Sequence, residues 1–280
     1  MKFHQTDRGV EIPLTIDFDL SQTLECGQCF RWNKTEDGAF QGIVKGKAIS
    51  VREDAGSQTI VLEGVSPEDF STIWADYFDL DFDYAGVRAQ LCQAHPDLTK
   101  MAEFAPGIRL LRQDPWEALC SFIISQNNNI PRIQGIVQRL CQHFGQRTPD
   151  GFLFPTPERM AALTVEDLAP LRSGFRAKYL LSAAQLVSAG QVDLEALRVM
   201  PMEEARASLM QIVGVGPKVA ECALLYGLHR LEAFPMDVWM KRAMAALFPG
   251  YQPEDFGEYA GIAQQYIFHY SRSNPKIFTD

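Results

Sequence analysis

The sequence predicts an α+β fold, in which an antiparallel sheet comes first and a helical body follows. Short alternating or β-branched stretches, separated by Gly, Asp, Glu and Asn, run through residues 14–65. Helix-start signals, followed by apolar residues at steps of three and four, dominate from residue 66 onward. We therefore expect a β-rich N-terminal domain with trailing helices over residues 1–105 and a helical domain over residues 106–280.

Each element has a local signal. Three stretches have the composition of strands: Phe30-Arg31-Trp32, Gly42-Ile43-Val44 and Thr59-Ile60-Val61-Leu62. The helix starts share a capping side chain that precedes Pro or acidic residues in the first turn. They are Ser66-Pro67, Asp114-Pro115, Thr156-Pro157 and Thr164-Val165. No repeat of fixed period and no low-complexity linker interrupts this order.

The composition indicates a folded chain and leaves its partner open. The 280 residues are 46% apolar, which is enough to bury a core and argues against disorder. The net charge of −9 argues against a nucleic-acid partner, since phosphate binding needs a cationic surface. Residues 1–105, however, hold 9 basic and 18 acidic side chains, whereas residues 106–280 hold 17 of each. The acidity belongs to the first part, so the second can still bind DNA.

The chain shows no export or membrane signal. Its start lacks an apolar stretch with a cleavage site, and apolar runs such as Ala118 to Ile124, which Ser121 interrupts, are far too short to span a membrane. We expect a reducing cytoplasm, in which the six cysteines are thiols. Cys26 and Cys29 form a Cys-x-x-Cys pair, but no second pair lies at zinc-finger spacing, so we expect no metal or redox site there.

Residues 205–228 have the form of helix, tight turn and helix. Gly214 and Gly216 allow close approach of the backbone to a partner, and Pro217 suits the first turn of the second helix. The free amides at that helix start, with the positive end of its dipole, suit a phosphate oxygen. The pattern favours a helix-hairpin-helix that contacts the DNA backbone without reading sequence. An ordinary helix–turn–helix corner is the alternative.

Lys218 and Asp237 carry the chemistry. A lysine in the first turn of a helix faces an unfavourable dipole. If it is also partly buried, it should lose its proton more easily than a free lysine, as an amine nucleophile requires. Asp237 follows nineteen residues later, where an N-cap position keeps a carboxylate ionised. Such an anion stabilises positive charge on a sugar whose N-glycosidic bond breaks. The alternatives are a phosphate-contacting lysine and a purely capping aspartate.

The segments Gly214 to Cys222 and Pro235 to Val238 resemble the helix-hairpin-helix Gly/Pro-Asp signature of base-excision DNA glycosylases, and the lysine is typical of the bifunctional branch. Three further segments resemble the 8-oxoguanine DNA glycosylases: Cys26 to Trp32, Ser125 to Ile133 and Gly174 to Tyr179. The resemblance spans nearly the whole chain. It implies a bacterial-type member with an N-terminal domain like the TATA-binding protein, which excises 8-oxoguanine opposite cytosine and nicks the strand through a lysine Schiff base.

The resemblance also implies a role for each matching residue. The catalytic pair is Lys218 and Asp237, and the lesion-base pocket is Gly27, Cys222, Gln264 and Phe268. The residues that fill the gap left by the flipped nucleotide and contact the opposite base are Asn127, Arg132, Phe175 and Arg176. Phosphate contacts fall to Gly214 and Gly216, and a monovalent cation is possible on the carbonyls of Met210, Ile212 and Val215. Core packing is the alternative for Cys222 and Phe268.

The chain departs from the family pattern at a few positions. Trp239 stands where many members have a histidine, Phe175 replaces a tyrosine, and no acidic residue follows Phe268 closely. The C-terminal part lacks four closely spaced cysteines, so no iron–sulfur cluster and no required cofactor are expected. We expect a cytoplasmic, nucleoid-associated monomer whose partner is double-stranded DNA containing 8-oxoguanine. The alternatives are a glycosylase for an alkylated purine and a non-catalytic DNA-binding module.

Overall fold

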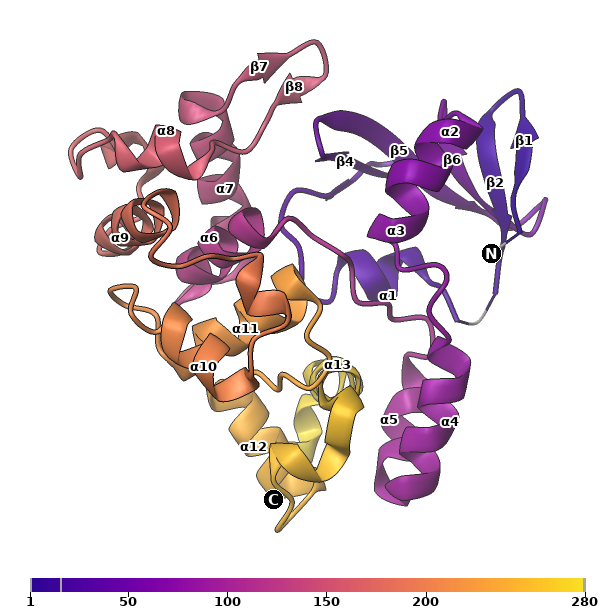
Figure 1. Ribbon diagram of the computed structural model, residues 1–280. Coiled ribbons are helices and arrows are strands. Elements are labelled where there is room, and N and C mark those ends of the chain that lie inside the picture. The colour runs from indigo at the N-terminus through magenta and orange to yellow at the C-terminus, as the bar shows by residue number, and fades with distance from the viewer. Residues whose placement is uncertain (1, 16, 279–280) are drawn as a thin grey trace.

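The computed structural model describes residues 2–15 and 17–278. A six-stranded antiparallel sheet forms the N-terminal part, with the strand order β1-β2-β6-β5-β4-β3 (Figure 1). Its strands are β1 (His4–Thr6), β2 (Gly9–Pro13), β3 (Asn33–Lys34), β4 (Phe40–Val44), β5 (Lys47–Asp54) and β6 (Thr59–Glu63). The predicted strands at residues 42–44 and 59–62 are confirmed, since they lie in β4 and β6.

One face of this sheet is buried under short helices. Phe40, Val51, Leu62 and Val10 are neighbours across four strands and are almost completely buried. Alternate residues of a strand point to opposite faces, so this row defines the core face. The elements that supply the rest of this core are α1 (Leu20–Leu24), α2 (Pro67–Asp69), a π-helical turn (Phe70–Trp74) and α3 (Ala75–Tyr77).

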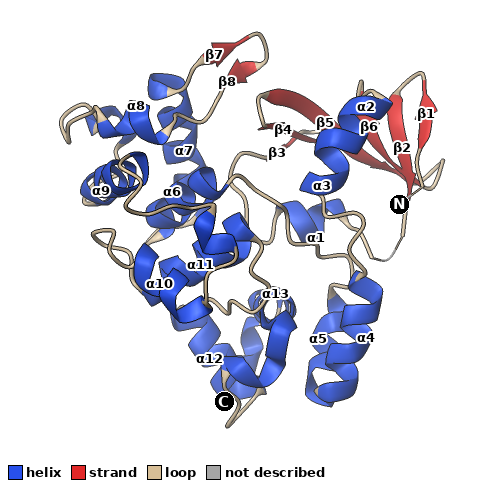
Figure 2. Ribbon diagram, viewed as in Figure 1, coloured by secondary structure: helices blue, strands red, loops and turns tan. Residues whose placement is uncertain are grey.

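Helices make up the rest of the chain, apart from one small hairpin (Figure 2). The first are α4 (Tyr84–Ala94), α5 (Thr99–Phe104), α6 (Pro115–Ser125) and α7 (Ile130–Phe144), which the hairpin β7 (Arg147–Thr148) and β8 (Gly151–Phe152) follows. The others are α8 (Pro157–Ala161), α9 (Arg176–Ser188), α10 (Met202–Leu209), α11 (Pro217–Leu228), α12 (Val238–Leu247) and α13 (Ala260–Ser273). The predicted order of sheet followed by helical body is confirmed.

Helix α11 lies at the centre of the helical body and packs along α6. The two helices approach closely because Gly227 has no side chain. A Cβ at this position would lie only 3.0 Å from the Cβ of Ala118. Leu91 and Met101, from α4 and α5, belong to the same hydrophobic core as α6 and α11. The trailing helices of the first part therefore pack with the helical body, and the boundary near residue 105 stays a prediction.

The helix caps follow the sequence signals with one exception. The side chains of Ser66, Asp114 and Thr156 each accept a hydrogen bond from the backbone N–H three residues on. The α-helix predicted at Thr164 is wrong, because Thr164 and Asp167 bond each other's backbone N–H groups around a turn. The capping pattern is present there, and Leu168 and Leu171 are buried, but Pro170 has no N–H to donate within an α-helix, so only the 3₁₀ turn Ala169–Leu171 follows.

The predicted strand at residues 30–32 is also wrong. These residues form irregular chain between α1 and β3. The indole of Trp32 packs over Gly42, where a Cβ would come within 2.8 Å of the ring, and its Nε1 donates to the Tyr77 hydroxyl at 2.8 Å. The aromatic residues in this stretch thus pack into the core and do not pair as a strand.

No helix among the described residues is long and apolar enough to cross a membrane.

A buried carboxylate joins the sheet domain to the end of α11. The carboxylate of Asp79 lies 3.0 Å from Nε2 of His229, the residue that ends α11, and accepts from Nε of Arg112 at 2.7 Å and from the hydroxyl of Tyr84 at 2.9 Å. Burial opposes the ionised form, but the hydrogen bonds and charges of His229 and Arg112 outweigh it and lower the pKa of Asp79.

This cluster predicts acid sensitivity. A lowered carboxyl pKa contributes stability above the unfolded value near 3.9, and this contribution is lost as the pH falls through the folded value. The free energy of unfolding of Asp79→Asn is expected to be lower by about 3 kcal/mol at pH 7 and to decline less steeply below pH 4 than that of the wild type. Asn tolerates the positive φ of 51° at this position. Urea unfolding from pH 3 to 7 measures both, and parallel decline of the two proteins would refute the assignment.

Candidate active site

A cleft of about 750 Å³ lies between the loop that follows α1 and the helical body. Four of the predicted site residues line it, although they come from four separate parts of the chain: Gly27, Lys218, Asp237 and Phe268. The predicted pair of amine and carboxylate therefore faces a single cleft. This is the arrangement that the nineteen-residue spacing could suggest but not establish.

Lys218 is presented by the first turn of α11. Pro217 opens this helix, and the half-buried lysine side chain reaches across to α6. Its Nζ donates to Oγ of Ser125 at 3.4 Å and lies 5.4 Å from the centre of the Phe122 ring. The amine is thus held by one long hydrogen bond and faces the cleft, where it can approach a ligand.

Asp237 caps helix α12. Its Oδ1 accepts from the backbone N–H of Met240 at 2.7 Å, which confirms the predicted N-cap. The carboxylate lines the cleft at the same time. Capping and a role in the cleft therefore coexist, because one carboxylate oxygen is enough for the cap.

A buried acid fixes the spacing between these two groups. Glu221, one turn after Lys218 on α11, is 7% exposed. One of its oxygens accepts from Nε of Arg206 on α10 at 2.6 Å, and the other accepts from the backbone N–H of Phe234 at 2.8 Å. Because Phe234 lies three residues before Asp237, this carboxylate connects both helices of the hairpin to the loop that carries the second catalytic candidate.

The hairpin between α10 and α11 is anchored by two buried apolar side chains. Ile212 and Val215 are buried, whereas Met210 and Val213 are 42% and 59% exposed. Gly214 has a φ of +81°, and a Cβ there would lie 2.4 Å from the Tyr179 ring. Glycine is thus required at this position for two reasons: the backbone conformation disfavours other residues, and the Tyr179 ring leaves no room for a side chain. The helix-hairpin-helix predicted for residues 205–228 is confirmed.

The two hairpin glycines are expected to respond differently to alanine. Gly214→Ala should lower the free energy of unfolding by at least about 1–2 kcal/mol, since it forces a left-handed alanine against the ring. Gly216 has a negative φ, and its added Cβ meets nothing within 4 Å. Gly216→Ala should therefore leave thermal stability unchanged and weaken DNA binding, because the methyl group would stand between the amides and a phosphate. Equal loss of stability in both variants would contradict this distinction.

Gly27 lies in a turn that is fixed from behind. Its φ of +90° suits glycine. The next residue, Gln28, is 1% exposed; its Nε2 donates to the carbonyls of Thr23 and Arg109, and its Oε1 accepts from the N–H of Leu111. These bonds connect the Gly27 turn to the segment that leads into α6, so the Cys-Gly-Gln pattern has a structural reason.

The other three residues predicted for the lesion-base pocket differ in exposure. Phe268 lines the cleft, and the guanidinium of Arg272 lies 5.6 Å from its ring centre. Cys222 and Gln264 are 2% and 4% exposed and do not line the cleft. Burial raises the pKa of Cys222 to about 11, against the charge of Lys218, which lowers it. Contact of these two side chains with a base stays a prediction.

Gln264 lies in a network behind the cleft. Its Nε2 donates to the carbonyl of Pro235 at 3.3 Å, and its Oε1 accepts from Nε2 of Gln265 at 2.8 Å. Since Pro235 is two residues before Asp237, this amide supports the loop that carries the carboxylate. In the protein alone, Gln264 is thus a positioning residue.

The three consecutive asparagines after α6 have separate tasks. Asn128 donates to the carbonyl of Ile124, and Asn129 caps α7 by accepting from the N–H of Arg132. Asn127 has a φ of +47° and an exposed side chain, for which the described residues provide no hydrogen bond. Of the three asparagines, Asn127 alone has a side chain that no described residue holds, and its entry into a DNA duplex stays a prediction.

Arg176 holds this loop from α9. It is 2% exposed, and its guanidinium donates to the carbonyls of Gln126, Asn127 and Ser173. Burial, and next the nearby charge of Arg132, lower the pKa of Arg176. Phe175, which precedes it, is 48% exposed and lies against the same guanidinium. Residues predicted to contact the opposite strand thus gather at one edge of the cleft.

The Cys-x-x-Cys pair is structural. Both thiols are buried and free, and Sγ of Cys26 donates to the carbonyl of Thr23. Burial raises the pKa of Cys26 to about 11 and that of Cys29 well above its usual value, so both are protonated at neutral pH. The sequence reasoning missed Phe122, Ser125, Glu221 and Arg272 as site residues. Only the proximity of Ser125 to the asparagines could have indicated one of them.

Two models of known protein families match the chain. Residues 11–119 match the model of the 8-oxoguanine DNA glycosylase N-terminal domain, and residues 120–254 match that of the HhH-GPD superfamily of base excision DNA repair proteins. The chain belongs to the 8-oxoguanine DNA glycosylases. This family lies within the HhH-GPD superfamily, as the lysine hairpin and the aspartate loop predict.

The relatives cover nearly all of the chain. The N-glycosylase/DNA lyase OGG1 of Arabidopsis thaliana is 32% identical over 95% of this chain and 82% of its own length. A solved structure of MBOgg1 with a low-affinity DNA ligand has a TM-score of 0.91 at 39% identity and covers 99% of this chain and 100% of that one. The 8-oxoguanine glycosylase/lyase of Clostridium acetobutylicum, bound to DNA with cytosine opposite 8-oxoguanine, has a TM-score of 0.90 at 34% identity, with 98% and 99% coverage.

Proposed function

We propose that this chain is a base-excision repair enzyme that removes 8-oxoguanine opposite cytosine from double-stranded DNA and then nicks the strand. The observation that carries the proposal is the placement of Lys218 and Asp237 on one cleft, beside Gly27 and Phe268. A half-buried amine and a carboxylate that face the same space suit displacement at a sugar carbon.

The reaction has two stages, removal of the base and cleavage of the strand. The lone pair of Lys218 Nζ attacks C1′ of the flipped nucleotide, and the bond to the base breaks with its electrons leaving on the base. Asp237 stabilises the positive charge on the sugar. The nitrogen passes a proton to the departing nucleobase, and the resulting N,O-acetal opens to a Schiff base as the C1′–O4′ bond breaks and O4′ takes up a proton. A general base then removes a proton from C2′, and the 3′ phosphate leaves with the electrons of its C–O bond. Water then hydrolyses the Schiff base and frees the lysine.

The edge of the cleft supports recognition of cytosine. Asn127 would fill the gap in the duplex, and Arg132 would donate to the cytosine left unpaired. Arg176 would have to exchange the carbonyls of Gln126 and Asn127 for this base, which couples base recognition to movement of the asparagine loop. Phe175, already exposed, would wedge beside the opposite strand.

The hairpin turn suits a monovalent cation. The carbonyls of Met210, Ile212 and Val215 would hold it, since oxygen atoms are the ligands that hard cations prefer and the buried side chains of Ile212 and Val215 fix the backbone. The carbonyl of Ile212 accepts from the N–H of Val215 at 3.0 Å and keeps a second lone pair. The cation would help to bind a DNA phosphate. Replacement of K⁺ by choline should then weaken DNA binding.

Incubation with end-labelled duplexes tests the proposal. A duplex with 8-oxoguanine opposite cytosine should be cleaved before alkali is added, and a 3-methyladenine duplex should be spared. Cleavage only after alkali would refute the lyase step. Preference for 3-methyladenine would refute the lesion, and tight binding without base release would leave only a DNA-binding module.

A further inference from the structure

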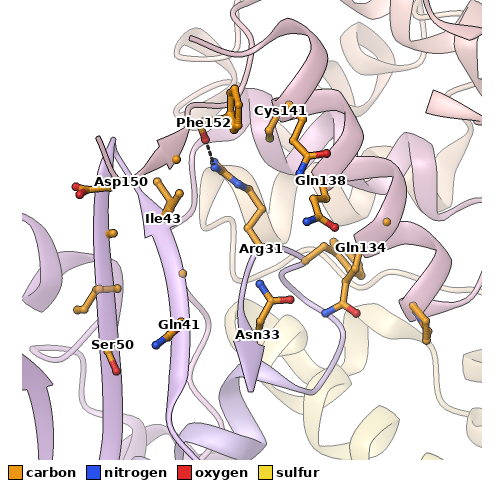
Figure 3. A pocket seen from close by; sticks show the side chains of 18 of the residues that line it. Arg31, Asn33, Gln41, Ile43, Ser50, Gln134, Gln138, Cys141, Asp150 and Phe152 are labelled. Carbon is orange, nitrogen blue, oxygen red and sulfur yellow. Dashed lines mark hydrogen bonds between the residues drawn. The ribbon is translucent and has the colours of Figure 1, made fainter. Parts of the chain in front are cut away.

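A second cavity, of about 810 Å³, lies beside the active-site cleft. It is open to solvent and is bordered by the sheet, by helix α7 and by the hairpin β7–β8 (Figure 3). Four residues line both spaces: Phe30, Asn33, Pro131 and Gln134. The two cavities therefore adjoin, and none of the steps described above uses the second.

Carboxamides dominate the polar lining of this cavity. Gln134, Gln138 and Gln142 follow one another at steps of four along one face of α7. Asn33 and Gln41 face them from strands β3 and β4. Each carboxamide offers two donors and one acceptor oxygen without a charge, so the lining suits a neutral ligand that carries both donors and acceptors.

The charged groups of the lining are already neutralised, except at the rim. Arg31 projects into the cavity, but its guanidinium donates to Glu117 at 3.0 Å and to the carbonyl of Phe152 at 2.6 Å. Glu63 accepts from Nε of Arg52 at 2.5 Å. Asp150 lies on the exposed hairpin turn. An anionic ligand would thus find no free cation in the interior of the cavity.

One buried polar atom on the lining lacks a partner. Oγ of Ser50, on strand β5, is inaccessible and makes no hydrogen bond to any described residue. Buried hydroxyl groups in folded proteins are normally hydrogen-bonded, so this oxygen has unused hydrogen-bonding capacity just beneath the lining. Apolar surface for the faces of a planar ligand is supplied by Phe30, Ile43 and Phe152.

We propose that this cavity is a binding site for a free purine base. Carboxamides pair with purine edges through simultaneous donation and acceptance, and the adjoining apolar side chains suit a planar ring. The proposal rests on the proposed function for its choice of base, because a neutral oxidised purine is what the adjoining cleft would release. The cavity thus offers that product a place outside the catalytic cleft.

Calorimetry and ligand-detected NMR with free 8-oxoguanine and the full-length protein test this site without any DNA. The wild type is expected to bind two equivalents. Gln138→Leu should weaken one of the two binding steps about tenfold or more, through loss of a hydrogen bond, and leave the rate of single-turnover excision unchanged. The matched control is Gln146→Leu, since Gln146 is an exposed glutamine that does not line the cavity.

Phe268→Ala separates the two sites, because Phe268 lines only the cleft. This variant should lose the step that Gln138→Leu retains. The proposal is overturned if Gln138→Leu binds the base as the wild type does, or if Phe268→Ala abolishes all binding. A protein that binds two bases yet releases none from DNA would refute the proposed function and leave the second site standing.

Discussion

Lys218→Gln is expected to form no borohydride-trapped adduct with 8-oxoguanine DNA and to lower the excision rate at least about 1000-fold, which corresponds to about 4 kcal/mol in the activation free energy. The physical reason is that a carboxamide has no basic lone pair to attack C1′. The side chain is half-buried and makes one weak hydrogen bond, to Ser125, so the fold should tolerate the change.

The measurement is single-turnover excision together with trapping on the same duplex. Lys45→Gln is the matched control, because Lys45 is an exposed lysine on the turn between β4 and β5, where it pairs with Asp76. It should trap and excise as the wild type does. An adduct that persists in Lys218→Gln would show that another amine is the nucleophile.

Asp237→Asn should lower excision by about 100- to 1000-fold while the melting temperature hardly changes. Asparagine is as good an N-cap as aspartate, so the bond to the N–H of Met240 survives and α12 remains capped. What disappears is the negative charge that is proposed to stabilise the sugar cation. The variant therefore separates the two tasks of this residue.

Asp237→Ala provides the comparison, since it removes both the cap and the charge. We expect it to lose about 1 kcal/mol of stability in addition to the same loss of rate. Thermal unfolding and single-turnover excision of the two variants give the answer. If Asp237→Asn excises at the wild-type rate, the carboxylate serves the helix alone.

Short-range signals account for the elements that the sequence predicted. The caps at Ser66, Asp114, Thr156 and Asp237 involve residues three positions apart, so the chemistry of a few neighbours decides them. The same signal failed at Thr164, where Pro170 interrupts the helix. The aromatic stretch at residues 30–32 failed as a strand because the core buries Phe30 and Trp32.

Some features of the candidate site also follow from local sequence, and others depend on the tertiary structure. The order of residues determined the helix-hairpin-helix, with its positive-φ glycine, and the capped aspartate, since each depends on a local backbone conformation. Only the tertiary structure decided that Lys218 and Asp237 face one cleft and that Glu221 fixes their spacing. It also buried Cys222, Gln264 and Arg176 and opened the carboxamide-lined cavity beside the cleft. The reason is that burial depends on contacts between distant segments, which no window of sequence contains.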